Sequence, residues 1–280
     1  MIKRMSIGMR NYYINKYGLT DGARRMAEHG YTHLDFQIVN TDTEYYTMSE
    51  SDLVLKMREM RDILEQNGIT VHQIHGPWRA PRDSTEEDRR ERFEKMSRAL
   101  LIAKLLGARY MAIHPLMPFG ADSPDNPEEL YEINRRYFTA LARVADSLGV
   151  VVCLENLPFR SFPLSPSRRV YDFVKEIGMP SLKMCLDVGH SHIMGESIAD
   201  TVRYIADELC ILHIHDNDGT NDIHLPPYDG NADICALGDV LREIDFPGIV
   251  MLETSPRPRD GEDDLTAELR LAEITRKIME

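Results

Sequence analysis

Side chains that can bind a metal ion recur along this chain, each directly after a short apolar run. The residue types are histidine, aspartate and glutamate, and six runs in succession end in one of them. The six segments are Val71–His75, Ala112–His114, Val152–Glu155, Met184–Asp187, Ile211–His215 and Val250–Glu253. Imidazole nitrogen and carboxylate oxygen without thiolate suit zinc or manganese best, with cobalt, magnesium or iron as alternatives, and suit calcium less well. The pattern therefore predicts a divalent metal site, provided that the fold brings these run ends together.

The apolar runs belong to a repeated unit. Eight β-like runs alternate with helix-like stretches, and they are Met5–Met9, Thr32–Ile38, Thr70–His75, Tyr110–His114, Val150–Glu155, Lys183–Asp187, Cys210–His215 and Gly248–Glu253. Strands that alternate with helices form a parallel sheet. An open doubly wound sheet should carry G-x-G-x-x-G after its first strand, and Gly8-Met-Arg-Asn-Tyr12 lacks that pattern. We therefore expect an α/β fold in which residues 1–280 form a single (β/α)8 TIM barrel domain, with its active site where the strands end.

The stretches between the strands carry helix signals. Ser84-Thr-Glu-Glu87 has the form of a capping box and opens a helix over Arg89–Leu106. Apolar residues recur at helical spacing over Glu128–Leu148 and over Ile198–Leu209. Five glycines each follow a predicted helix and precede a strand, which is the usual place of a C-terminal cap. These glycines are Gly30, Gly68, Gly107, Gly149 and Gly178.

Composition restricts the function classes. The net charge of −13 is a poor basis for binding the phosphate backbone of nucleic acid. The apolar runs have the length of strands, and Met1–Arg10 is too short and too polar for a signal peptide, so we expect a cytoplasmic protein with no membrane span. The four cysteines lack C-x-x-C spacing, and three of them lie in apolar runs, which predicts buried reduced thiols.

The seventh run offers two histidines. Residues two apart on a strand face the same side, so His213 and His215 can both point into the barrel, in different layers. His215 is nearer the strand end and is the better candidate ligand, while His213 fills or supports the layer below. His72 should face away from His75 and is expected to be structural. Three more candidates for contacts with metal or substrate lie beyond strand ends: His190, Asp222 and His224.

These strand endings resemble those of the xylose isomerase-like TIM barrels. That family contains sugar phosphate isomerases and epimerases and also endonuclease IV (AP endonuclease family 2). The resemblance covers nearly the whole chain, and its most specific parts are Leu154-Glu-Asn156, Cys185-Leu-Asp-Val-Gly-His190, His213-Ile-His-Asp-Asn-Asp-Gly219 and Asp222-Ile-His-Leu-Pro226. The epimerase branch implies one metal held by four residues, of which the two glutamates are the catalytic acid/base pair. The four are Glu155, Asp187, His215 and Glu253.

The endonuclease IV branch implies a different occupancy of the same region. There the resemblance implies three zinc ions held by nine residues: His75, His114, Glu155, Asp187, His190, His215, Asp222, His224 and Glu253. All nine residue types are present, so the ligands alone do not separate the branches. The segment Gly76-Pro-Trp-Arg-Ala-Pro81 lacks the tyrosine-containing loop that this branch uses to penetrate DNA.

The predicted top loops leave two interpretations open. Trp78 either stacks on the apolar face of a sugar ring or packs beneath its loop. Arg79, Arg82, Arg257 and Arg259 either bind an anionic small molecule or are solvated.

Taken together, the residues predict an enzyme that acts on a small carbohydrate. Our main expectation is a divalent-metal-dependent isomerase or epimerase of a sugar or keto-polyol, acting through an enediolate. Glu155 and Glu253 would be the acid/base pair, and His190 would orient a substrate oxygen. Two alternatives remain: a trinuclear zinc phosphodiesterase that acts on abasic DNA, and a dehydratase of a keto-sugar or keto-polyol. A homo-oligomer stays open.

Overall fold

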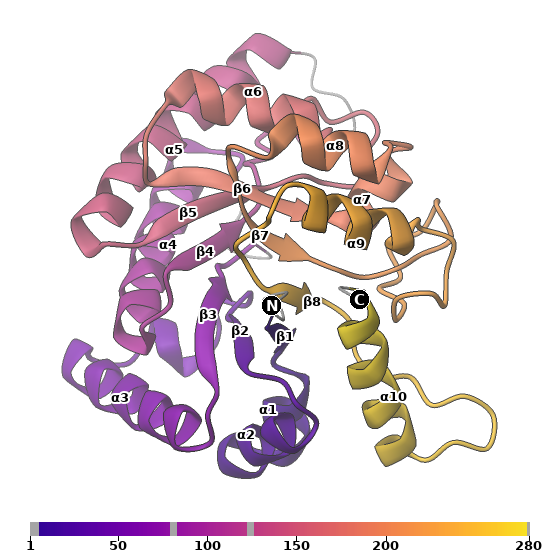
Figure 1. Cartoon of the computed structure of the whole chain (residues 1–280). Helices are drawn as coiled ribbons and strands as arrows, with labels where there is room; N and C mark the ends of the chain where they lie inside the picture. The colour runs from indigo at the N-terminus through magenta and orange to yellow at the C-terminus, as the bar shows by residue number, and fades with distance from the viewer. Residues whose placement is uncertain (1–5, 79–82, 122–125, 279–280) are drawn as a thin grey trace.

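The structure of the chain is a computed structural model that describes residues 6–78, 83–121 and 126–278, and its strands lie together with helices around them (Figure 1). All strand pairs are parallel, in the order β7-β6-β5-β4-β3-β2-β1-β8. The strands are β1 (Ile7–Arg10), β2 (His33–Gln37), β3 (Thr70–His75), β4 (Tyr110–Ile113), β5 (Val151–Glu155), β6 (Leu182–Asp187), β7 (Leu209–His213) and β8 (Val250–Leu252).

The ring closes between β7 and β8 through one residue. Ile214 forms a parallel bridge with Leu252. Its N–H donates to the carbonyl of Met251 at 2.9 Å, and its carbonyl accepts from the N–H of Glu253 at 3.0 Å. The predicted (β/α)8 TIM barrel is therefore confirmed.

Helices follow the strands on the outside of the ring. They are α1 (Tyr12–Tyr17), α2 (Leu19–Glu28), η1 (Glu44–Tyr46), α3 (Glu50–Gln66), α4 (Glu86–Leu106), α5 (Pro127–Leu148), α6 (Ser167–Ile177), α7 (Val188–Ile193), α8 (Ile198–Ile205), α9 (Ile234–Glu243) and α10 (Asp264–Lys277). The five glycines after predicted helices all have φ between 63° and 86°, as the cap prediction requires. In the part of the chain that is described, none of these helices is long and apolar enough to cross a membrane.

Two predicted helix boundaries are wrong. The capping box lies one residue later than expected: the Thr85 hydroxyl accepts from the N–H of Asp88, and the Asp88 carboxylate accepts from the N–H of Thr85. Both candidate boxes have the same spacing, so the sequence pattern could not choose between them. The helix predicted over Ile198–Leu209 ends at Ile205, because Leu209 pairs with Met184 in the sheet.

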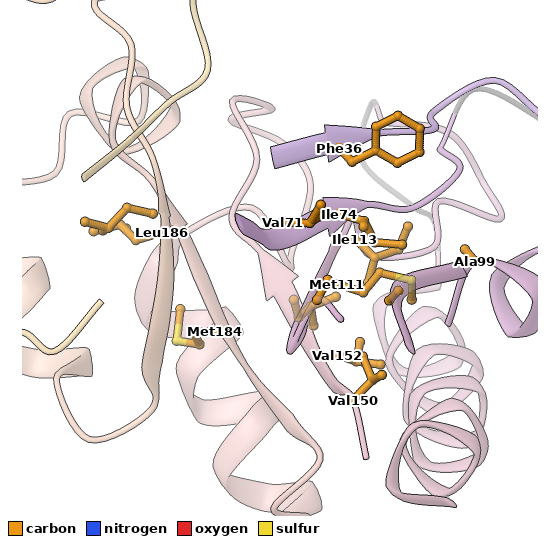
Figure 2. Close-up of a cluster of buried hydrophobic side chains, with 14 of the residues drawn as sticks. Phe36, Val71, Ile74, Ala99, Met111, Ile113, Val150, Val152, Met184 and Leu186 are labelled. Atoms are coloured by element: carbon orange, nitrogen blue, oxygen red, sulfur yellow. The ribbon is translucent and has the colours of Figure 1, made fainter. Parts of the chain in front are cut away.

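The strands present apolar side chains outward to the helices and a smaller set inward. Figure 2 shows part of this outer core, in which Met111 and Ile113 lie toward Ala99 of α4, while Met184 and Leu186 lie farther along the same cluster. The inner positions of the same strands carry a separate buried cluster, which consists of Ala112, Cys153, Cys185 and Ile211.

The inner cluster lies next to the polar strand ends. Glu155 and Asp187 are the next inner residues after Cys153 and Cys185, because side chains alternate along a strand. The apolar cluster thus lies directly beneath two buried carboxylates. The cysteines are free, as predicted, but Cys210 is only half-buried.

A buried carboxylate joins the last helix to the first two. Glu268 of α10 is fully buried and accepts hydrogen bonds from Tyr17 Oη at 2.6 Å, Arg25 Nε at 2.6 Å and Tyr12 Oη at 3.2 Å. Lys16 Nζ lies 3.5 Å away. Glu268 therefore links the last helix to the first two, next to the pairing of β1 with β8.

Replacing Glu268 by glutamine should destabilise the fold. The substitution removes the charge that compensates Arg25, and breaking a buried ion pair by removing one partner costs about 3–5 kcal/mol. Arg25 is partly exposed, so we expect a loss of roughly 2–3 kcal/mol in the free energy of unfolding, measured by urea denaturation. Glu273→Gln is the matched control, since Glu273 lies exposed on the same helix and pairs with Lys277. Equal stability of the two variants would contradict this role.

Candidate metal centre

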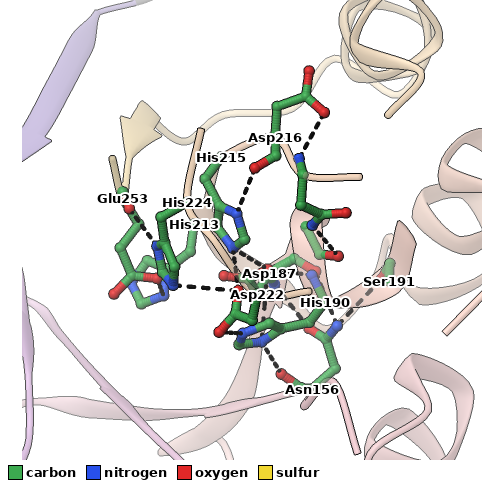
Figure 3. Close-up of polar contacts among 12 residues, drawn as sticks. Asn156, Asp187, His190, Ser191, His213, His215, Asp216, Asp222, His224 and Glu253 are labelled. Carbon is green, nitrogen blue, oxygen red and sulfur yellow. Dashed lines mark hydrogen bonds and ion pairs between the residues drawn. The ribbon is translucent and has the colours of Figure 1, made fainter. Parts of the chain in front are cut away.

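The predicted ligands gather at the carboxyl ends of the strands. All nine residues come together there, and part of the cluster is seen in Figure 3. Seven of them are buried, whereas His224 is half-buried and Asp222 is exposed. Glu155 ends β5 and Asp187 ends β6, whereas His75 ends β3 and His114 directly follows β4. The convergence that the run ends predicted is therefore present.

Among the described residues, the potential ligand atoms form five groups, and three of these groups together contain all nine predicted ligands. In each of these three groups, one imidazole or carboxylate atom per residue lies within 4.8 Å of the others. The first group is His75, His114 and Glu155; the second is Glu155, Asp187, His213 and Glu253; the third is His190, His215, Asp222 and His224. Glu155 belongs to the first two groups, and Asp187 lies against the third, since its Oδ1 is 3.1 Å from His215 Nε2.

Both histidines of the seventh run point inward, as predicted, and they have different neighbours. His213 Nδ1 lies 3.1 Å from Glu155 Oε1 and 3.3 Å from Glu253 Oε2, so it occupies the space between the two glutamates. His215 faces Asp187 and stacks on His224, with ring centroids 3.9 Å apart. His213 therefore belongs to the second group, which we call the central group. His215 belongs to the third group and lies against Asp187 of the central group.

The spacing of these atoms fits a bound cation. Two ligands about 2.1 Å from one ion, at a tetrahedral angle, lie roughly 3.4 Å apart. The contacts of Glu155 with His75 and His114 are 3.3 Å and 3.4 Å, and Asp222 lies 3.3 Å from both His190 and His224. Several of the buried atoms also lack a well-oriented hydrogen bond among the described residues. They are Glu155 Oε1 and Oε2, Asp187 Oδ2, His213 Nδ1 and His215 Nε2.

The pKa shifts within the cluster also fit a bound cation. Burial raises the pKa of the Glu155 carboxyl, but nearby imidazoles, first that of His213, outweigh burial and hold this pKa well below its ordinary value. Burial lowers the pKa of His190, yet the carboxylates of Asp187 and Asp222 raise it to about 10. The carboxylates therefore attract positive charge, which protonated histidines or a divalent cation can supply.

The D-V-G-H segment positions two of the ligands. The side-chain amide of Asn156 donates to the carbonyl of Asp187 and accepts from its N–H, at 2.9 Å and 2.8 Å. The Asp187 carboxylate caps α7 by accepting from the N–H of His190. Gly189 leaves room for the ring of His215, because a Cβ at Gly189 would lie 2.0 Å from His215 Cε1.

The loop that carries Asp222 and His224 is tied down at both ends. The buried Asp216 carboxylate accepts from four backbone N–H groups, at Asn217, Tyr228, Gly230 and Ala232. His224 has φ of 46°, which is unusual for a residue with a side chain. Its Nδ1 lies 2.6 Å from the carbonyl of Glu253, and its carbonyl accepts from Thr254 Oγ1 at 2.6 Å. Two contacts to the end of β8 thus hold this backbone conformation.

A small cavity of about 120 Å³ opens onto the cluster. Its lining combines candidate ligands with apolar side chains. The described residues that line it are His75, Trp78, His114, Met117, Glu155, Leu157, Pro158, Phe159, His190, Asp222, His224 and Glu253. Trp78 also lies against His114, with ring centroids 5.2 Å apart, so it both lines the cavity and packs within the site.

Other predicted residues lie outside this cavity lining. Arg257 donates to the backbone carbonyls of Ile223 and His224, and Arg259 pairs with Asp229, so both arginines stabilise the loops themselves. Arg79 and Arg82 lie outside the described residues. The His72 ring contacts those of His33 and Tyr110, in agreement with a structural role.

A polar layer that the pattern of strand ends did not indicate lies beneath the candidate ligands. Asp35 and Gln73 are fully buried, and Gln73 Nε2 lies 2.9 Å from His213 Nε2. Gln37 donates to Glu253 Oε1 at 2.6 Å. A signal was available, since Asp35 and Gln37 alternate with apolar residues along β2, as inward-facing positions should. The second strand ends in glutamine and not in histidine or a carboxylate, so the pattern of strand ends did not point to it.

Comparison with known proteins agrees with this architecture. The model of the family described as "Xylose isomerase-like TIM barrel" matches residues 23–274. The chain belongs to this family. It is 26% identical to a D-psicose 3-epimerase of Enterocloster bolteae, over 75% of this chain and 68% of that protein.

Two solved structures share the fold of this family member. One is the 3-keto-D-glucoside 4-epimerase YcjR from E. coli, with a TM-score of 0.78 and 20% identity over 98% of this chain and 99% of that one. The other is the IOLI protein with a bound zinc atom, with a TM-score of 0.77 and 18% identity over 98% of each chain.

Gly189→Ala should weaken metal binding. The added methyl group would displace the His215 ring, and disturbing the support of a ligand typically costs about 10–100-fold in metal affinity. We expect this loss in a Mn2+ titration followed by calorimetry, together with about 1–3 kcal/mol of overpacking in the metal-free protein.

A double variant separates the two effects. Gly189→Ala with His215→Ala removes the clashing ring, so the stability of the metal-free protein should recover while Mn2+ binding stays weak. Wild-type Mn2+ affinity in the single variant would show that His215 takes no part in binding.

Proposed function

We propose that this protein is a divalent-metal-dependent isomerase or epimerase of a sugar or keto-polyol. The observation that carries the proposal is the pair of buried carboxylates Glu155 and Glu253. They come from strands that are not neighbours, and both approach His213 Nδ1 within 3.3 Å. The sugar epimerases among the relatives support the same reaction class. A small uncharged carbohydrate also suits a cavity whose described lining contains no lysine or arginine.

The residues would divide the chemistry as follows. A bound divalent cation, held by Glu155, Asp187, Glu253 and a histidine of the seventh run, would supply Lewis-acid polarisation of the substrate carbonyl. One glutamate removes the proton from the carbon next to that carbonyl, and the other returns a proton to the enediolate.

Two further residues would hold the substrate. His190 orients a substrate oxygen, and its ring is fixed because its Nδ1 bonds the carbonyl of Asn156 at 2.8 Å. Trp78, which also lines the cavity, covers an apolar face of the sugar.

Glu155→Gln should abolish turnover while the fold survives. The amide cannot take up the proton, and loss of a general base typically costs about 100-fold to 10,000-fold in rate. The assay is a screen of ketoses and keto-polyols at saturating Mn2+, read by product formation and by deuterium incorporation from D2O. Far-ultraviolet circular dichroism checks the fold. Substantial activity of Glu155→Gln on a substrate of the wild-type enzyme would eliminate this role, and release of water would identify a dehydratase instead.

The three ligand groups favour one alternative function. They contain all nine residues that a trinuclear zinc phosphodiesterase would need, including Asp222 and His224 of the loop that Asp216 holds. This alternative predicts three metals per chain and nicking of abasic DNA.

Metal content separates the two functions. For the epimerase we expect one tightly bound metal per chain, measured by mass spectrometry after dialysis against Zn2+ or Mn2+. His224→Gln should leave that content unchanged, because His224 lies outside the central group. Three metals in the wild type, fewer in His224→Gln and nicking of an abasic oligonucleotide would replace our proposal by the phosphodiesterase.

A further inference from the structure

Gln37, the last residue of β2, lies between two carboxylates at the edge of the centre. Its Nε2 donates to Glu253 Oε1 at 2.6 Å and approaches Asp35 Oδ2 at 3.4 Å. Gln37 is neither a candidate metal ligand nor part of the segments that carry the family resemblance. We infer that Gln37 is a positioning residue that holds the Glu253 carboxylate in the orientation needed for metal binding and proton transfer. The inference rests on the proposed role of Glu253.

The orientation of the Gln37 amide is determined by its surroundings. A glutamine amide can usually be placed with its oxygen and nitrogen exchanged, and only its partners decide between the two. Here the end of the amide that faces Glu253 also faces Asp35. An amide oxygen there would face two carboxylates, whereas the NH2 group has one hydrogen for each. Gln37 therefore acts as the donor, and its bond to Glu253 is the stronger, charge-assisted kind.

The backbone of Gln37 is fixed as well. The side-chain amide of Asn11, just after β1, accepts from the N–H of Gln37 at 3.0 Å and donates to its carbonyl at 2.9 Å. Asn11 is itself buried. The end of β2 is thus clamped to the end of β1, and the Gln37 side chain extends from a rigid point toward β8.

This arrangement constrains the two oxygens of Glu253 separately. Gln37 holds Oε1, while Oε2 faces His213 Nδ1 at 3.3 Å. The terminal torsion of a glutamate is soft, so a carboxylate without a fixed partner rotates easily. Gln37 supplies that partner, which keeps one oxygen of Glu253 directed at the centre of the ligand group.

Gln37→Met is the informative substitution, because methionine retains the volume and removes the donor. We expect Mn2+ affinity, measured by calorimetry on the whole metal-free chain, to fall about 10–100-fold, as is usual when the support of a ligand is lost. Gln66→Met, at the exposed end of α3, is the matched control and should bind Mn2+ as the wild type does. Asn11→Ala should give a smaller loss in the same direction, because it loosens the Gln37 backbone alone.

Proton exchange provides a second readout that a merely structural role would not change. With D-fructose and D-psicose as probes in D2O, a misoriented Glu253 should leave removal and return of the proton by Glu155 intact. Deuterium should then still enter one of the two recovered substrates, while formation of the epimer falls. For that substrate, the rate of deuterium incorporation divided by the rate of epimer formation should rise about tenfold.

The outcomes separate the inference from the proposed function. Weaker Mn2+ binding in Gln37→Met with no ketose turnover by the wild type would support the inference and count against the epimerase. Unchanged Mn2+ affinity in Gln37→Met, with Gln66→Met also unchanged, would overturn the inference whatever the enzyme does. The inference would also be wrong if Gln37→Met lowered the thermal stability of the metal-free protein but left the Mn2+ affinity and the ratio of deuterium incorporation to epimer formation unchanged. Gln37 would then have a structural role alone.

Discussion

Buried carboxylates that converge at the carboxyl ends of the strands impose the main physical constraint on this molecule. Glu155 and Asp187 are fully buried, and Glu253 nearly so. Charges removed from water in this way are costly unless opposite charge and hydrogen bonds compensate them. The surrounding histidines can supply that compensation as imidazolium ions or can bind a cation together with the carboxylates. Much of the upper half of the barrel is explained by this one requirement.

The surrounding structure fixes several candidate ligands, each from a different element. Asn156 brackets the backbone of Asp187, Gly189 leaves space for His215, and Asp216 organises the loop that brings His224 onto the site. His224 is held in a rarely populated backbone region by contacts to the end of β8, and such conformations persist only where the surroundings determine them. Rigid support of this kind is what a metal site needs to keep its geometry in the absence of the ion.

The same set of side chains is compatible with more than one chemistry, for a physical reason. Carboxylate and imidazole bind one ion or several with similar ligands, so residue type does not determine the number of ions. Neighbouring groups share Glu155 and meet at Asp187. What distinguishes the branches is the occupancy of the outer groups and the nature of the cavity beside them. The proposal of a sugar substrate draws on the apolar side chains of Trp78, Leu157 and Phe159, which line the cavity beside the candidate ligands.

The barrel, the inward alternation of His213 and His215, and the convergence of the six strand-end residues could be predicted from the sequence, because they follow from the periodicity of one strand and from the repetition of one unit. That loop residues such as Asp222 and His224 join them was implied by the family resemblance. Relations between strands could not be predicted in this way. The sequence pattern favoured His215 as a ligand because it ends the predicted strand Cys210–His215. Only the tertiary structure shows that His213 lies between Glu155 and Glu253. Gln37 and Glu253 are 216 positions apart in the chain. They come into contact because β1 lies between β2 and β8 in the closed ring. The sequence by itself determined which chemical groups reach the end of the barrel; the tertiary structure decided which of them face one another, because distances across a barrel depend on strand tilt and closure and not on spacing along the chain.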